Sequence, residues 1–170
     1  MKIYLKLFIV FLLVFSSSQL FAQQCENDNA ALQSMGRVNV TFTRADGSSF
    51  ELEAKYANDS LTRAAGFQRV CPERVESTLI LFEFEDAVTP QFHMNNVVAP
   101  LDIAFIDENG RVESTQLMNI YSLLMRSKPL YSPSRPIIAA LEAHKGFYQQ
   151  HKIDVSSKIS WEVVADQDKN

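Results

Sequence analysis

The sequence lacks the short motifs that identify common enzyme classes. No G-x-S-x-G run occurs, so the nucleophile elbow of a serine hydrolase is missing. None of the three histidines stands in an H-x-x-x-H pair, and the two cysteines do not form a CxxC motif. Asp46-Gly47 and Asn109-Gly110 are turn dipeptides rather than phosphate-binding loops. The sequence therefore predicts no metal site and no cofactor.

Positive charge is also scarce. The chain has 16 Lys and Arg against 20 Asp and Glu, a formal net charge of -4. Residues 1–22 hold two lysines and no acids, so removing them changes the charge from -4 to -6. No basic run or basic–aromatic stripe offsets this acidity, and an acidic surface repels phosphate backbones. Nucleic acid is therefore not an expected partner.

The N-terminal segment has the three-part order of a secretory signal. A basic head, residues 1–6, precedes an uncharged apolar run, residues 7–20, and Ala22 supplies a small residue for cleavage. The strongly apolar core, Leu7 to Phe15, is shorter than the roughly 20 residues that a membrane anchor needs. We therefore predict a signal peptide over residues 1–22 rather than an anchor. The mature protein is expected to be periplasmic or secreted, with no integral membrane span.

Cysteine is limited to Cys25 and Cys71. In an exported chain, an even number of cysteines favours a disulfide. A bridge would tether the N-terminal tail, residues 23–36, which would otherwise fray. The alternative is two unrelated thiols or a redox pair. Because there is no CxxC spacing and no histidine nearby, the structural bridge is favoured.

Alternating apolar and polar residues predict strands. The clearest signal is a hairpin formed by residues 38–43 and 50–56 around Asp46-Gly47. A short helix over 61–65 follows, with Asp59 as its cap and Gly66 at its end. Further strands are expected at 79–84, 92–94, 101–106, 111–117, 137–141 and 158–164, and short helices at 27–34 and 146–152.

The segment 118–136 has no single predicted structure. Its apolar residues have helical spacing at first, but Pro129, Pro133 and Pro136 exclude a regular helix or central strand at its end. It is interpreted as a short helix or irregular loop followed by an extended segment. Strands without regular strand–helix alternation indicate a mainly β or α+β protein. We expect one domain over residues 37–164, a compact antiparallel or mixed barrel-like sheet with two or three short helices, and a C-terminal tail over 165–170.

A series of residues in this order resembles a known family. The series comprises Ile80 to Phe84, Phe92 to Asn96, Pro100 to Asp107, Gly110 to Val112, and Ala140 to Glu142. With them, residues 37–164 are similar to the family called domain of unknown function 192, and Pro100 to Phe105 is the most specific piece. The resemblance implies a small β-rich domain that is often exported. It implies no activity, because none is established for the family.

The sequence departs from this family at several positions. Gly66-Phe67-Gln68 stands where Gly-Leu-Met is usual, and residues 92–97 have His93, Asn95 and Val97 in place of the family's Trp, Lys and Thr. The glycine expected near the C-terminal strand is missing from residues 155–157. If the replaced residues line a shared site, either the ligand differs or this copy is divergent.

Two carboxylates are the best candidates for a functional role. Asp102 lies on a strand that is apolar on both faces, and Glu142 ends the apolar run from Ile137 to Leu141. An acid in such a position is costly unless it is paired or hydrogen-bonded. Each could accept backbone N–H bonds or pair with an arginine, contact a ligand, or divide acid and base roles with the other.

These residues lead to three functional hypotheses. The favoured one is a binding or accessory module for a small-molecule or peptide ligand, with a cleft near the proline-rich segment around Tyr131. Its expected ligand-binding residues are His93, Met94, Asn95, Asn96, Asp102 and Glu142. The second is a small hydrolase that uses Asp102 and Glu142. The third is a purely structural envelope protein. Phe82, Phe84, Phe92 and Phe105 are assigned to the core rather than to an aromatic binding platform.

Overall fold

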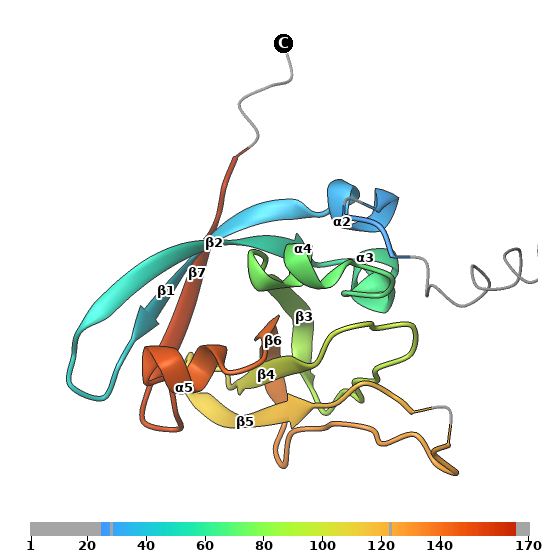
Figure 1. Cartoon of the computed structure of the whole chain (residues 1–170). Helices are drawn as coiled ribbons and strands as arrows, with labels where there is room; N and C mark the ends of the chain where they lie inside the picture. Colours follow the sequence, from blue (N-terminus) through green and yellow to red (C-terminus); the bar gives the residue numbers. More distant parts are fainter. Residues whose placement is uncertain (1–24, 28, 123, 166–170) are drawn as a thin grey trace, which may run out of the picture.

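The computed structural model describes residues 25–27, 29–122 and 124–165 (Figure 1). The predicted signal peptide, residues 1–22, lies outside the described residues, as do residues 166–170 of the predicted tail. Within the described part of the chain, no helix is both long and apolar enough to cross a membrane.

One mixed sheet of seven strands organises the fold, in the order β5-β4-β6-β3-β2-β1-β7. Neighbouring strands are antiparallel except β2 and β3, which pair in parallel through residues 55–57 and 80–82. The strands are β1 (Gly36–Thr43), β2 (Ser49–Ala57), β3 (Ile80–Val88), β4 (Leu101–Ile106), β5 (Val112–Met118), β6 (Ile137–His144) and β7 (Lys158–Val163).

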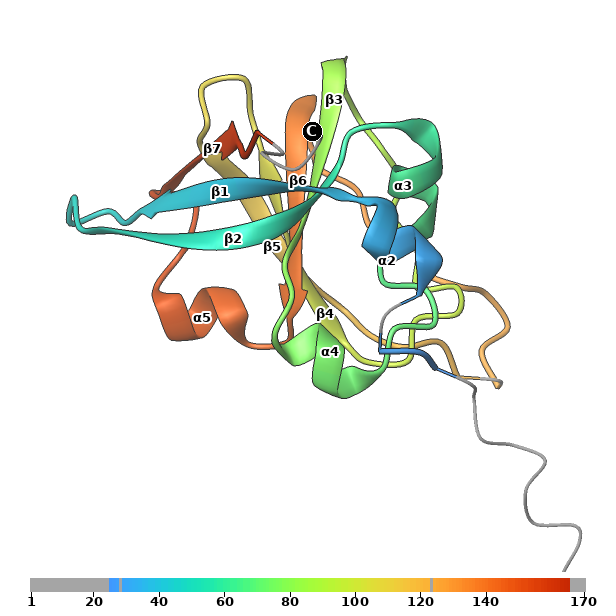
Figure 2. The ribbon, with the colours of Figure 1, turned by 90° about the horizontal axis from the view of Figure 1, so that it is seen from above.

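The predicted mainly β or α+β class is confirmed, but the sheet is not closed into a barrel. At its two edges, β5 and β7 approach each other at one end only, where a single bridge joins Arg111 to Lys158. The other described residues of β5 and β7 do not pair with each other, so the sheet is open. It is strongly curled (Figure 2).

Short helices cover parts of the sheet: α2 (Ala30–Ser34), α3 (Ser60–Ala65), α4 (Pro72–Glu76) and α5 (Phe147–His151). The predicted start of α3 is confirmed, since the Asp59 carboxylate accepts the N–H groups of Leu61 and Thr62. Gly66 ends this helix with a φ of 47°, a region that side chains disfavour. Helix α4 was not predicted, because its five residues contain one apolar side chain, Val75, and so show no periodicity.

The central strands are buried on both faces because successive side chains point to opposite sides of the sheet. One face of β3, β4 and β6 contributes Phe82, Ile103 and Ala140 to a core beneath α2 and α3. The other face contributes Leu81, Ala104 and Leu141 to a second core, which α5 and the β1–β2 hairpin cover. Every residue of the interior strand β6 from Ala139 to Ala143 is therefore buried.

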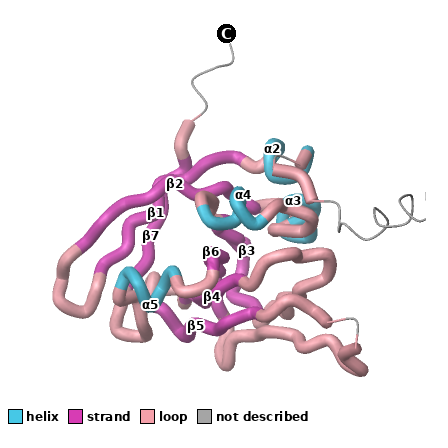
Figure 3. Tube along the Cα trace, viewed as in Figure 1, coloured by secondary structure: helices cyan, strands magenta, loops and turns pink. Residues whose placement is uncertain are grey.

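The structure differs most from the predicted strands at β3 and at residues 92–94. The strand β3 continues through the exposed Glu85 and Asp86 to Val88. Its pairing with β6 is interrupted by an irregularity after Glu83 and resumes where Val88 pairs with Ile137. Residues 92–94 form no strand, but Phe92 makes one bridge to Tyr131 with backbone hydrogen bonds of 2.8 and 2.9 Å. This bridge holds the β3–β4 loop against the β5–β6 loop, and the two run side by side (Figure 3).

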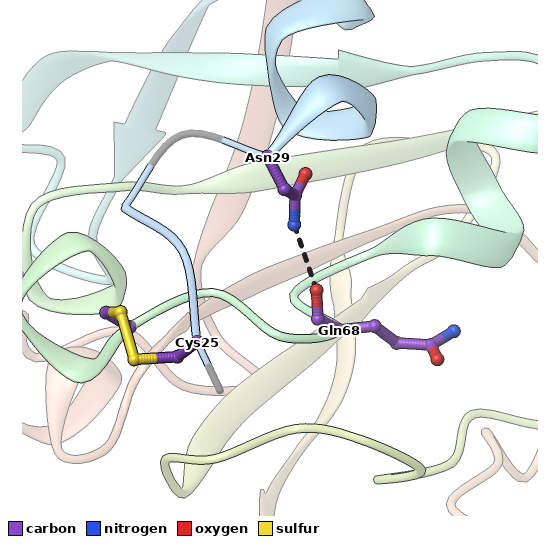
Figure 4. The surroundings of a disulfide bond; sticks show 4 residues. Cys25, Asn29 and Gln68 are labelled. Carbon is purple, nitrogen blue, oxygen red and sulfur yellow. Dashed lines mark hydrogen bonds between the residues drawn. A yellow bond between two sulfur atoms is a disulfide. The ribbon is translucent and has the colours of Figure 1, made fainter. Parts of the chain in front are cut away.

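The predicted disulfide between Cys25 and Cys71 is confirmed. It fixes the N-terminal segment along residues 68–71. There, the Glu26 backbone exchanges hydrogen bonds with Arg69 and Cys71. The Asn29 side chain donates a 2.9 Å hydrogen bond from Nδ2 to the Gln68 carbonyl oxygen (Figure 4). The segment after α3 is therefore held from outside by the N-terminal tail.

Replacement of Cys71 by Ala is expected to lower the free energy of unfolding by about 4 kcal/mol. The bridge closes a loop across a sequence separation of 46 residues, and its loss returns that loop's freedom to the unfolded chain. Urea titration of the oxidised wild type and of the variant measures the difference. The Cys25→Ala and double variants serve as controls and should lose the same amount. A loss below 1 kcal/mol, or additive losses in the double variant, would contradict a stabilising bridge.

Candidate functional site

A pocket of about 240 Å³ opens between α3 and the β3–β4 loop. Four parts of the chain line it: the end of α3 with the turn that follows, strand β3, the β3–β4 loop, and strand β6. The lining residues are Arg63 to Gln68, Phe82, Phe84, Pro90 to His93, Val97 and Glu142.

The pocket has a buried floor and an exposed mouth. Phe67, Phe82 and Val97 are buried at the floor, together with Glu142. At the mouth, Ala64, Gln91 and His93 are exposed, and Arg63 is half-buried. A molecule inside the pocket therefore contacts hydrocarbon and one carboxyl group at the floor, and charged or polar side chains near the solvent.

Strand register places the Glu142 side chain at the floor. Glu142 pairs with Ile80 on β3 and with Ile103 on β4, so its side chain shares the face of the sheet that lies beneath α3. Gly66 lies directly above it, because a Cβ atom added there would be 3.6 Å from Oε2 of Glu142. The absence of a side chain at Gly66 leaves the carboxyl group open to the pocket.

Glu142 has no polar partner within the described residues. It is 5% exposed, and no described side chain or backbone group forms a hydrogen bond or an ion pair with its carboxyl. Burial raises its pKa from 4.5 to about 8. At neutral pH the group is therefore mostly a neutral carboxylic acid, which can donate one hydrogen bond through its O–H and accept others.

The positive charge of the pocket lies at the mouth. Arg63 donates a 2.9 Å hydrogen bond from Nη1 to the Glu83 carbonyl oxygen. Its guanidinium carbon is 5.5 Å from the centroid of the Phe84 ring. These two contacts fix the guanidinium beside the opening and leave its other N–H groups without an acceptor among the described residues.

Phenylalanine rings form most of the wall. Phe82 and Phe92 pack edge to face with centroids 5.3 Å apart, and Phe92 also packs against Phe105 at 5.8 Å. Phe105 belongs to the core, as the sequence predicts. Phe82, Phe84 and Phe92 contact that core as well, but each presents a side to the pocket. The assignment of these three to the core alone was therefore incomplete.

Hydrogen bonds join the two sides of the pocket. The backbone N–H of Arg69 donates to the Asn96 carbonyl at 2.8 Å, and Nδ2 of Asn96 donates to Oε1 of Gln68 at 3.0 Å. Arg69 and Asn96 both have a positive φ, of 60° and 57°, which is uncommon outside glycine and shows that the chain bends sharply here. The wall formed by residues 66–70 is thus braced by the β3–β4 loop and by Asn29.

Asp102 lies on the opposite face of the sheet from Glu142. It pairs with Ala143, one residue further along β6, so its side chain points away from the pocket. Its Oδ2 accepts the Gly146 N–H at 2.9 Å, and burial is the main cause of its raised pKa. It lines a separate cleft with Lys145 and Tyr148. The two carboxylates of the hydrolase hypothesis therefore do not share a site.

The remaining predicted residues divide between two pockets. His93 belongs to the first, and Met94, Asn95 and Asn96 line a second one of about 200 Å³, together with Tyr121, Ser122, Met125 and Lys128 of the β5–β6 loop. His93 reaches the mouth of the pocket, whereas Met94 is buried in the core. Asn95 accepts a 3.0 Å hydrogen bond from Lys128 Nζ, and Asn96 braces the wall from behind. Of the six predicted ligand-binding residues, the pocket lining thus includes His93 and Glu142.

Sequence reasoning missed the contribution of α3 to the site. Arg63, Phe67 and Gln68 carry no catalytic or binding motif, and the sequence indicates no role for an arginine other than pairing with an acid. The available signal was the departure from the family pattern at Gly66-Phe67-Gln68, which lies directly over the floor. In the part of the chain that the structure describes, no cluster of three or more His, Cys, Asp or Glu side chains could hold a metal ion.

Comparisons with known proteins agree with the resemblance in the sequence. The family model DUF192, described as "Uncharacterized ACR", matches residues 41–161. No curated protein matches the chain.

Two solved crystal structures share the fold. One is a candidate transcription regulator from Sinorhizobium meliloti 1021, at 20% identity and a TM-score of 0.65, which covers 75% of this chain and 95% of that one. The other is a protein of unknown function from Novosphingobium aromaticivorans DSM 12444, at 23% identity and a TM-score of 0.62, which covers 80% of this chain and 99% of that one.

The raised pKa of Glu142 predicts a pH-dependent stability. Below pH 4.5 the carboxyl is protonated in both the folded and the unfolded chain, so it has no effect. Above pH 4.5 the unfolded chain ionises while the folded one does not until about pH 8, so stability falls across this window. Relative to Glu142→Gln, the wild type should lose about 3 kcal/mol of unfolding free energy between pH 4.5 and pH 7.

Urea unfolding at a series of pH values measures this loss. The exposed Glu162, replaced by Gln, is the matched control and should follow the wild type. If the difference between wild type and Glu142→Gln is the same at pH 4.5 and pH 7, the carboxyl does not have a raised pKa.

Proposed function

The chain belongs to the uncharacterised family DUF192, and from this premise we propose that it is a binding module for a small, mainly apolar organic molecule. The ligand occupies the pocket between α3 and the β3–β4 loop. One observation carries the proposal: an apolar pocket has a buried carboxyl group at its floor that no described residue hydrogen-bonds.

The groups that line the pocket favour a bound ligand. The Glu142 carboxyl has no hydrogen bond to a described residue, so a ligand atom can pair with it, and such a hydrogen bond contributes roughly 0.5–1.5 kcal/mol net. Contact with the phenylalanine wall adds about 25 cal/mol for each Å² of apolar surface removed from water. The volume of about 240 Å³ lies just below the range of about 300–1,000 Å³ of drug-sized sites, so the ligand is small.

Binding is favoured over hydrolysis by the separation of the acids. A two-carboxylate mechanism needs both groups at the same bond, and Asp102 and Glu142 point to opposite faces of the sheet. Asp102 is engaged by backbone N–H groups in its own cleft, which is a structural role. One acid in a braced, apolar pocket fits recognition better than cleavage.

We also propose that the module works in the periplasm or outside the cell. The Cys25–Cys71 disulfide supports this location, because such bonds persist in oxidising compartments. The signal-like order of residues 1–22 is the second argument.

Binding of isopropylbenzene tests the proposal with a neutral, apolar probe. In a titration followed by ¹H–¹⁵N NMR, the amide signals of Gly66 to Gln68 and of His93 should shift. The signals of Gly146 and Tyr148, beside the Asp102 cleft, should not. Ala64→Trp places an indole at the mouth and should weaken binding at least about tenfold, because the ring occupies the space of the ligand.

Gln149→Trp is the control for this substitution. It adds the same side chain to an exposed position in the Asp102 cleft and should leave the affinity unchanged. If the probe shifts no pocket signal, or if Ala64→Trp binds as tightly as the wild type, the binding function is refuted in favour of a structural role.

A further inference from the structure

The two ends of the pocket present different polar groups. These groups restrict the chemical class of the ligand more than the apolar wall of the pocket does. At the floor, the neutral Glu142 carboxyl has a proton to donate and no described acceptor for it. Around it lie Phe67, Phe82 and the bare backbone of Gly66. A ligand atom seated at the floor therefore accepts a hydrogen bond, as a carbonyl or ether oxygen does.

The mouth has the opposite requirement. Arg63 carries a permanent positive charge, and no described carboxylate forms an ion pair with it. Asp59 already accepts the N–H groups at the start of α3, and these hydrogen bonds, first of all the one from Thr62, lower its pKa more than the charge of Arg63 does. The N–H groups of Arg63 that do not bind Glu83 are thus available to an anionic group, and His93 adds a second polar side chain beside them.

The space between the two ends suits a flat ring. Phe82, Phe84 and Phe92 provide ring faces and edges to stack on. A cationic ligand is disfavoured, because Arg63 would repel it and the floor offers no negative charge at neutral pH.

We propose that the pocket selects small aromatic carboxylates with a carbonyl oxygen at the opposite end of the ring. The carbonyl oxygen accepts the proton of Glu142 at the floor, and the carboxylate binds Arg63 at the mouth. This inference rests on the proposed function and adds the chemical class of the ligand to it.

Three probes of similar shape test the class by isothermal titration calorimetry. The first is 4-acetylbenzoate, which has both groups. The second is 4-isopropylbenzoate, which lacks the acceptor oxygen, and the third is 4-acetylbenzylamine, which reverses the charge. At pH 7 the first should bind about tenfold more tightly than the second, because one hydrogen bond is lost. The third should bind more weakly than either carboxylate.

The pH profile tests the direction of the hydrogen bond. Above about pH 8, ionisation of Glu142 removes the donated proton, so the affinity for 4-acetylbenzoate should fall about tenfold for each pH unit. Glu142→Gln keeps an N–H donor at every pH and should remove this dependence. The charged or titratable groups near Glu142 are Arg63, His93 and, across the sheet, Tyr148, whose pKa burial raises well above 10. His93→Gln should therefore keep the wild-type profile.

Arg63 is tested by Arg63→Gln, with Arg63→Lys as the variant that keeps the charge. The first should weaken both benzoates about tenfold and leave isopropylbenzene unchanged, and the second should restore most of the loss.

The inference is overturned if isopropylbenzene binds but the acetyl oxygen gives no advantage. It is also overturned if affinity rises with pH or if the amine binds best. If isopropylbenzene itself does not bind, the proposed function fails and the inference fails with it. The comparison of probes on the wild type needs no variant, so a variant that does not fold leaves the test intact.

Discussion

A carboxyl group buried on the interior strand β6, with no hydrogen-bond partner among the described residues, is the constraint on which the rest of the site depends. Hydrocarbon residues surround Glu142 along its strand, and an apolar side chain of similar size would stabilise the sheet at neutral pH. The chain instead places an acid there and keeps it neutral by burial. Other interactions in the fold compensate the free-energy cost of burying the acid. The local structure around Glu142 keeps the cavity above it open.

Several features converge on keeping that cavity open. Gly66 ends α3 with a backbone conformation that disfavours a side chain, directly above the acid. The segment that follows is tethered to the N-terminal tail by the Cys25–Cys71 bridge and by the hydrogen bond from Asn29. On the other side, the Arg69–Asn96 hydrogen bond fixes the β3–β4 loop. The N-terminal tail therefore contributes to the site without touching it.

Much of this fold could be predicted from local patterns, and most of the site could not. The β1–β2 hairpin, the Asp59 cap and strand β4 each follow from a signal within about ten residues, and all three are present. By contrast, the opposite orientations of Asp102 and Glu142 depend on the register between β4 and β6. That register joins two segments that are far apart in the sequence, so neither segment alone predicts it. A shift by one residue would have brought both acids to one face.

The pocket itself is a non-local product. Arg63 and Phe84 are in contact because α3 packs beside β3, and no residue spacing in the sequence predicts that contact. Helix α4 was invisible for a related reason: five residues with one buried side chain are stabilised by Pro72 at the helix start and by packing rather than by a pattern.

The protonation state of Glu142 can be measured directly in the folded protein from the ¹³C chemical shift of its side-chain carboxyl. The signal is assigned by its loss in Glu142→Gln. We expect the shift to stay at the value of a protonated acid through pH 7 and to change with a midpoint near pH 8. A midpoint near 4.5, the ordinary value for glutamate, would mean that the carboxyl is solvated or paired, and the neutral floor of the pocket would not exist.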